Sequence, residues 1–165
     1  MVNFYHRGTG KRSREVDWVD PITKMDGFGY PTFAFVRARL ASVFSKELGI
    51  LLMTIPTEHT EEHKKMLSDI SPYVPLECCP MFCQYDCEGE LTAEQCAKIV
   101  KAYEGKDILA DIEHHEVNGP VHIKGMKPYV WKNDIINVDR VKTATKYFFD
   151  GIRHAAEKNK SFIWH

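Results

Sequence analysis

Hydrophobic residues at helical spacing run through residues 31–48 and predict the first long helix. Steps of three or four residues separate the members of one buried face: Phe33, Val36, Leu40, Phe44 and Leu48. Pro31 suits the first turn of a helix, because its missing N–H would have no helical partner there. Gly49 follows the last of these positions, and we expect it to end the helix as a left-handed cap.

The most regular helix is predicted for residues 93–104, directly after a capping signal. Thr92 is a preferred N-cap residue, and Gln95 three residues later completes the pattern of a capping box. Leu91 and Cys96 occupy the two positions of a hydrophobic staple, which fixes the angle at which the chain enters a helix.

Two other segments are predicted to be helical. A more polar helix is expected over residues 57–70, and the last helix begins after Asp139. The inward face of the last helix holds residues at the same spacing: Val141, Ala144, Phe148, Ile152 and Ala155. Helices therefore dominate the predicted fold.

A small β element completes an α+β fold class. Residues 2–7 and 161–165 are predicted as short terminal strands, and a turn signal at Asn118-Gly119 predicts a hairpin near residues 109–131. The apolar run at residues 50–56 is either a strand or a buried connector. Residues 8–29 hold glycines, a proline and charges, and indicate a loop.

Length and charge limit the class of protein. The 165 residues, 44% of them hydrophobic, suffice for a single domain spanning residues 1–165. Basic residues number 22 and acidic residues 23, so the chain lacks the positive charge of a nucleic-acid binder. We see no apolar stretch long enough for a membrane span or a signal segment, and expect a cytoplasmic protein with five reduced cysteines.

The segment CQYDCEGELTAEQC, residues 83–96, has the spacing of a calcium-binding EF-hand loop. With Gly89 at the sixth position, the candidate oxygen ligands are Gln84, Asp86, Glu88 and Thr92. Gln84 and Gln95 nevertheless supply amides where such loops use carboxylates. The competing interpretation, which we favour, is a turn at Gly89 that leads into a capped helix.

A second candidate metal site lies in the predicted hairpin. Asp111, Glu113 and His115 share one face of a strand, and His122 approaches from the paired strand. Two histidines with a carboxylate are a common donor set for transition metals. The alternative is an exposed hairpin with cross-strand charge pairs, which we favour.

Two weaker patterns also consist of metal-ligating residue types. His59 and His63 form the sequence H-x-x-E-H, which also describes the solvated face of an ordinary helix. The cysteines are clustered without the C-x-x-C pairs of zinc knuckles: Cys78, Cys79, Cys83, Cys87 and Cys96. We interpret most of them as core residues, with a thiolate metal site as the alternative.

The motif D-C-x-G-E-L-T-x-E-x-C resembles the signature of a group of small bacterial and phage proteins. The match is carried by Asp86, Cys87, Gly89, Glu90, Leu91, Thr92 and Cys96, with Glu94 at the remaining fixed position of the motif. The similarity extends to the helix around Arg37, and residues 106–138 look like an insertion relative to the group. Gln84, Tyr85 and Gln95 depart from its pattern. The resemblance implies a source and a fold unit, and brings no activity with it.

Besides a structural or regulatory calcium module centred on residues 84–95, two hypotheses of function follow, and whether the protein is an enzyme stays open between them. The first is a non-enzymatic domain that binds an unknown protein or small ligand, without a cofactor. The second is a metal-dependent hydrolase that uses Asp111, Glu113, His115 and His122 around a divalent metal.

Overall fold

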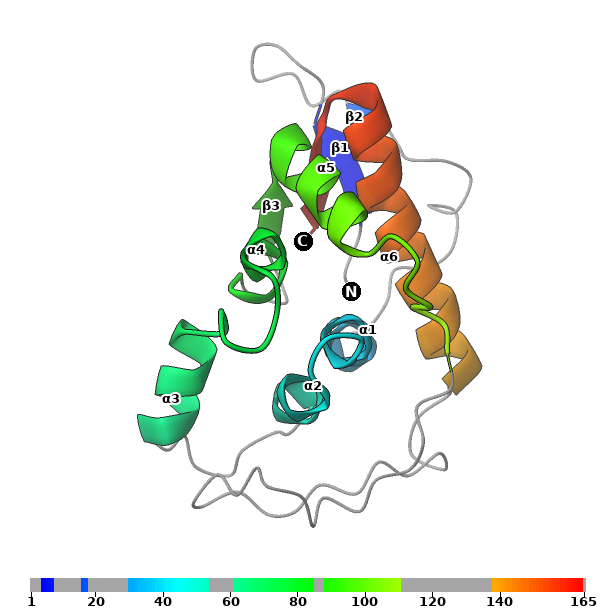
Figure 1. Ribbon diagram of the computed structural model, residues 1–165. Helices are drawn as coiled ribbons and strands as arrows, with labels where there is room; N and C mark the ends of the chain where they lie inside the picture. The colour runs from blue at the N-terminus through cyan, green and yellow to red at the C-terminus, as the bar shows by residue number, and fades with distance from the viewer. Residues whose placement is uncertain are drawn as a thin grey trace.

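The computed structural model of the protein describes residues 4–7, 16–17, 30–53, 61–84, 88–110 and 138–164. Its helices are α1 (Tyr30–Ser42), α2 (Lys46–Met53), α3 (Glu61–Ser68), the 3₁₀ turn η2 (Leu76–Cys78), α4 (Cys79–Phe82), α5 (Ala93–Ala102) and α6 (Val138–Lys158). Its strands are β1 (Phe4–Arg7), β2 (Val16–Asp17), β3 (Gly89–Leu91) and β4 (Ser161–Trp164). The predicted class, α+β with helices dominant, is confirmed (Figure 1).

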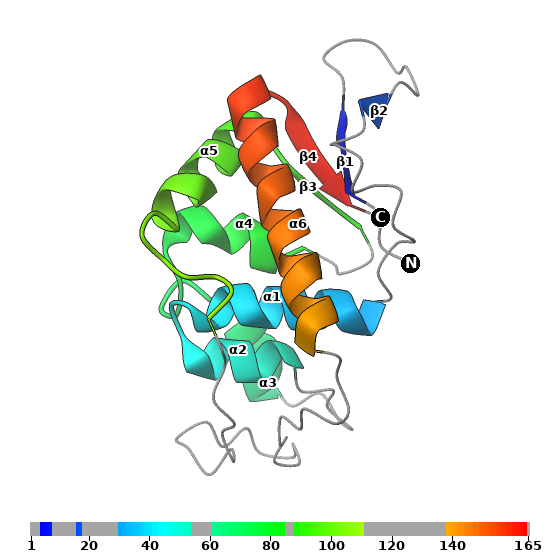
Figure 2. The same cartoon turned by 90° about the vertical axis from the view of Figure 1, so that its right-hand side faces the viewer.

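The strands form one antiparallel sheet in the order β2-β1-β4-β3 (Figure 2). β4 is paired on both sides: its Ile163 lies opposite Tyr5 of β1 and opposite Glu90 of β3. β1 and β4 are the two terminal strands that the sequence predicts. β2 lies in a segment predicted as loop, and β3 was not expected as a strand. The hairpin predicted near residues 109–131 lies almost entirely outside the described residues.

The first predicted helix is in fact two helices, and Gly49 does not cap it. α1 ends at Ser42, and α2 then continues through Met53, so residues 50–53 of the apolar run are helical and not a strand. A Cβ atom at Gly49 would lie 2.8 Å from both the Ala38 carbonyl oxygen and the Ser42 Cβ. Gly49 is therefore a packing position, where the absence of a side chain lets α2 approach α1 closely.

The hydrophobic core lies between the sheet and the long helices α1 and α6. The inward face predicted for α6 is confirmed, since all five of its residues are buried. Four aromatic rings meet here, with centroids 5.2 Å apart for Phe33 and Phe148, 5.3 Å for Phe148 and Phe162, and 5.7 Å for Phe148 and Trp164. α5 packs beside α6 and joins residues 83–96 to this core (Figure 2).

Candidate functional site

The calcium-like segment connects α4 to α5, and the Gln84 side chain contacts both ends of this connection. The Gln84 Nε2 donates to the Pro80 carbonyl oxygen at 2.8 Å and to the Glu90 carbonyl oxygen at 2.8 Å. The Glu90 backbone N–H donates in return to the Gln84 Oε1 at 2.6 Å. The two bonds between the Gln84 amide and the Glu90 backbone, which we call the amide bridge, thus join the end of α4 to β3.

Gly89 lies in β3 and is not the turn residue that the sequence predicted. It is buried opposite Trp164 of β4. A Cβ atom at this position would lie 2.0 Å from the Trp164 Cζ2 atom, well inside contact distance. The glycine of the motif is therefore needed for the indole ring to lie flat across the strand.

The capping box predicted at the start of α5 is confirmed. The Gln95 backbone N–H donates to the Thr92 hydroxyl oxygen at 3.2 Å, and the Thr92 N–H donates to the Gln95 Oε1 at 2.9 Å. Leu91 and Cys96, at the two staple positions, are both fully buried. The Cys96 thiol lies 3.9 Å from the Leu91 carbonyl oxygen.

These contacts occupy side-chain oxygens that the calcium interpretation assigns to an ion. The Gln84 Oε1, the Thr92 hydroxyl and the Gln95 Oε1 each accept a backbone N–H. Glu88 is exposed, and Asp86 lies outside the described residues. Among the residues that the structure describes, no three histidine, cysteine, aspartate or glutamate side chains form a group that could hold a metal ion.

Burial raises the pKa of the thiols in the described part of the chain. Desolvation, followed by the charges of Glu77 and Cys79, raises the pKa of Cys78 to about 12. Desolvation also raises the pKa of Cys96 to about 12. Both thiols are therefore protonated at neutral pH and are weak nucleophiles. Cys83 is exposed, and Cys87 lies outside the described residues.

The second candidate metal site falls outside the described residues, with all four of its members: Asp111, Glu113, His115 and His122. His59 is also outside, and of His63 only the helical backbone in α3 is described. Most of the 106–138 segment also lies outside the described residues. The hydrolase hypothesis therefore remains a prediction from the sequence.

Two arginines of α1 make contacts that the sequence analysis did not foresee. The Arg39 side chain is 2% exposed, and its Nη1 donates to the Ala110 carbonyl oxygen at 2.6 Å. The Arg37 Nη1 donates to the Gln84 carbonyl oxygen at 2.5 Å, and its guanidinium lies over the Phe33 ring. These contacts could have been predicted from the position of each arginine between buried positions of a helix, since such a side chain must find hydrogen-bond acceptors within the fold.

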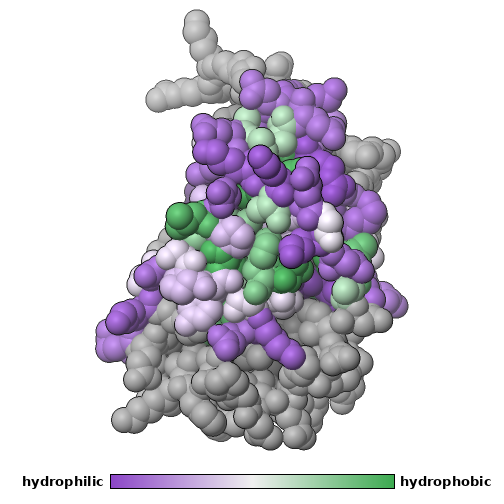
Figure 3. All heavy atoms as spheres, in the orientation of Figure 1, coloured by the Kyte–Doolittle hydropathy of each residue, from purple (hydrophilic) through white to green (hydrophobic). Residues whose placement is uncertain are grey.

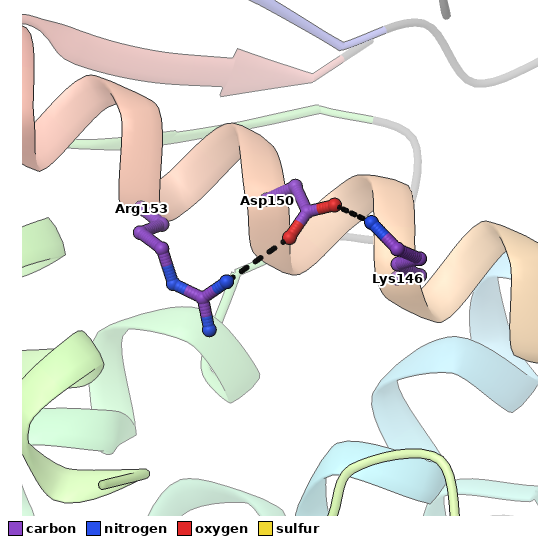
Figure 4. A network of polar contacts seen from close by, with 3 residues as sticks. All are labelled: Lys146, Asp150 and Arg153. Carbon is purple, nitrogen blue, oxygen red and sulfur yellow. Dashed lines mark hydrogen bonds and ion pairs between the residues drawn. The ribbon is translucent and has the colours of Figure 1, made fainter.

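The outer surface of α6 carries a chain of charges (Figure 4). The Lys146 ammonium contacts one Asp150 carboxylate oxygen, and the Arg153 Nη1 lies 3.2 Å from the other. The Arg153 guanidinium also lies 5.3 Å from the centre of the Phe149 ring. Exposed ion pairs of this type contribute little to stability, and we assign them no functional role.

Thr92→Ala should destabilise the protein by about 1 kcal/mol, the usual cost of losing an N-cap hydroxyl. Urea unfolding monitored by circular dichroism measures this change.

Millimolar calcium should leave the melting temperature of the wild type unchanged, because the amide and hydroxyl oxygens of Gln84, Thr92 and Gln95 accept hydrogen bonds from backbone N–H groups. A rise in melting temperature with calcium that Asp86→Asn abolishes would contradict the cap interpretation.

No helix in the described ranges combines the length and apolar character required to cross a bilayer. Comparisons of the chain with protein-family models, with curated proteins and with solved structures found no match.

Proposed function

We propose that the protein is a small non-enzymatic binding domain that engages a partner protein through the face around η2. Leu76 of η2 carries this proposal, because 72% of its side chain is exposed, and it is the large hydrophobic residue so exposed in the described part of the chain. Tyr73 and Cys79, three residues before and after it, are half-buried against the core. An exposed leucine beside half-buried apolar residues offers a partner protein apolar surface to cover.

The surface view supports this choice of face. Figure 3 shows hydrophobic side chains gathered in the middle of the face seen in Figure 1, around α4, with hydrophilic side chains above and beside them. η2 packs against α5, where Val100 is also half-buried. Apolar surface inside a polar rim is the usual composition of a protein–protein contact. The motif's resemblance to small bacterial and phage proteins suggests a mobile-element origin for such a domain.

A photo-crosslinking residue at position 76 should trap one defined partner in cell extract. The same residue at Lys158, an exposed position at the end of α6, serves as the matched control. Excess unlabelled wild-type protein should compete the adduct away, whereas Leu76→Glu should compete at least about tenfold less well, because a buried leucine contributes more than 1.4 kcal/mol. Equal melting temperatures of the two competitors would show that the fold is intact.

Two outcomes would contradict the binding proposal. One is equal labelling from positions 76 and 158, which would mean that the face around η2 is not a contact surface. The other is a stoichiometric divalent metal in untagged protein together with hydrolase activity that His115→Ala removes, which would favour the hydrolase hypothesis instead.

A further inference from the structure

Among the strands in the described residues, β3 is the outer one on the side of α4. The backbone groups of one of its residues point away from β4. In an antiparallel pair, successive residues direct their N–H and C=O groups alternately toward the partner strand and away from it. Both backbone groups of Glu90 bond to Gln84, so Glu90 is the residue of β3 that faces outward. Such groups at the margin of a sheet are available for pairing with another chain.

The Gln84 amide takes the place that a neighbouring strand would occupy. A side-chain amide has the same N–H and C=O groups as a peptide unit. Gln84 donates to the Glu90 carbonyl and accepts from the Glu90 N–H, which are the two bonds that a paired residue of an antiparallel strand makes. The amide bridge therefore supplies hydrogen-bond partners, from within the same chain, for the outward-facing N–H and C=O groups of Glu90.

Two further contacts hold Gln84 in this position. Its Nε2 also donates to the Pro80 carbonyl oxygen, in the last turn before the loop. Its own carbonyl oxygen accepts from Arg37 of α1, whose guanidinium lies against Phe33 of the core. The side-chain amide is thus fixed from α4, and the Gln84 backbone carbonyl is fixed from α1, so little conformational entropy remains to be lost when the amide binds Glu90.

We infer that the amide bridge closes the outer edge of the sheet and prevents β3 from pairing with β3 of a second copy of the chain. Two-fold symmetric antiparallel pairing of identical edge strands is the simplest contact that an open edge permits. Glu90 lies at the centre of the three-residue strand, so in such a pair it would face its own symmetry mate. The Gln84 amide is already hydrogen-bonded to the Glu90 N–H and C=O groups that this contact would use.

Gln84→Glu tests the inference, and Gln95→Glu is its matched control. Each variant adds one negative charge within residues 83–96, at the start of the connection for Gln84 and in the first turn of α5 for Gln95. The Gln95 side chain only accepts a bond in the capping box, so a carboxylate serves equally well there. Gln84 must also donate, and a carboxylate cannot. Gln84→Met, which removes the amide without adding charge, is the second variant in case the glutamate variant does not fold.

Hydrogen exchange at the Glu90 amide and sedimentation velocity are the two measurements. Gln84→Glu and Gln84→Met should exchange the Glu90 amide at least about tenfold faster than wild type, and both should self-associate as concentration rises. Acidification below the ordinary glutamic acid pKa of about 4.3 should restore the protection of the Glu90 amide, relative to its intrinsic exchange rate at the same pH, in Gln84→Glu and not in Gln84→Met, because only a protonated carboxyl can donate. Gln95→Glu should behave as wild type.

Unchanged exchange at Glu90 in both Gln84 variants would overturn the bridge itself. Faster exchange in variants that stay monomeric at all concentrations would overturn the closing role, since the opened edge would then recruit no second copy. Self-association of Gln95→Glu to the same extent would also overturn it, because charge in the loop and not the lost amide would be responsible.

Discussion

Gly89→Ala should lower the free energy of unfolding by about 3 kcal/mol, the upper range for forcing an extra methyl group into a packed core. The new Cβ would lie 2.0 Å from the Trp164 ring, and this ring is fully buried among Phe33, Phe148 and Phe162. Neither the indole nor the strand can move without disturbing other buried rings. Urea unfolding followed by tryptophan fluorescence measures the loss.

Gly105→Ala provides the comparison, at a glycine that is needed for its backbone conformation and not for close packing. Gly105 adopts a φ of 71° just after α5, and a Cβ atom there would meet no atom within 4 Å. Its replacement costs only the left-handed backbone conformation, about 1 kcal/mol. If Gly89→Ala were no more harmful than Gly105→Ala, the close contact between Gly89 and Trp164 would not exist in the folded protein.

Alkaline pH should destabilise the protein progressively between about pH 9 and pH 12. Burial raises the pKa of the Cys78 and Cys96 thiols from 9.0 to about 12, and burial likewise raises the pKa of the Tyr103 hydroxyl well above 10.0. These groups keep their protons in the folded protein and lose them in the unfolded chain. Stability is therefore complete below pH 9 and falls with rising pH, by at most about 1.4 kcal/mol per pH unit for each group.

Urea unfolding at pH 8.0 and pH 10.5 under reducing conditions measures this slope. The double variant Cys78→Ala/Cys96→Ala should show a clearly weaker dependence on pH than wild type. Cys83→Ala is the matched control, because Cys83 is exposed and its replacement should change the slope far less. Equal slopes for all three proteins would mean that the buried thiols do not control alkaline unfolding.

The helices could be predicted where one local signal determines them. The cap of α5 depends on Thr92 and Gln95, and the buried face of α6 depends on regular spacing, so both are visible in the sequence. The break between α1 and α2 could not be predicted, because the apolar spacing continues across it. Gly49 marks a contact between two helices and not a helix end, and that distinction depends on tertiary packing.

The candidate site was predictable only where its contacts are local in the sequence. The sequence correctly assigned Thr92 and Gln95 to a cap, since their bonding is local. It gave no indication that Gln84 pairs with Glu90 or that Gly89 faces Trp164, because these contacts depend on β3 and β4 forming a sheet. Three residues with one glycine are too short for an alternating pattern to identify a strand.

The central place of β4 has a consequence for the order in which the protein can fold. β1 pairs with β4 through Tyr5 and Ile163, which lie 158 positions apart in the sequence (163 minus 5). On the ribosome, β1 and β3 emerge long before the strand that joins them, and the aromatic core cannot close until Phe162 and Trp164 have been added. Helical segments such as α5 and the local pair of β1 with β2 can form early, whereas the pairing of β1 and β3 with β4 must form last. The nascent chain thus leaves β1 and β3 without their partner strand β4 for most of its synthesis, the period in which chaperones protect a polypeptide from aggregation.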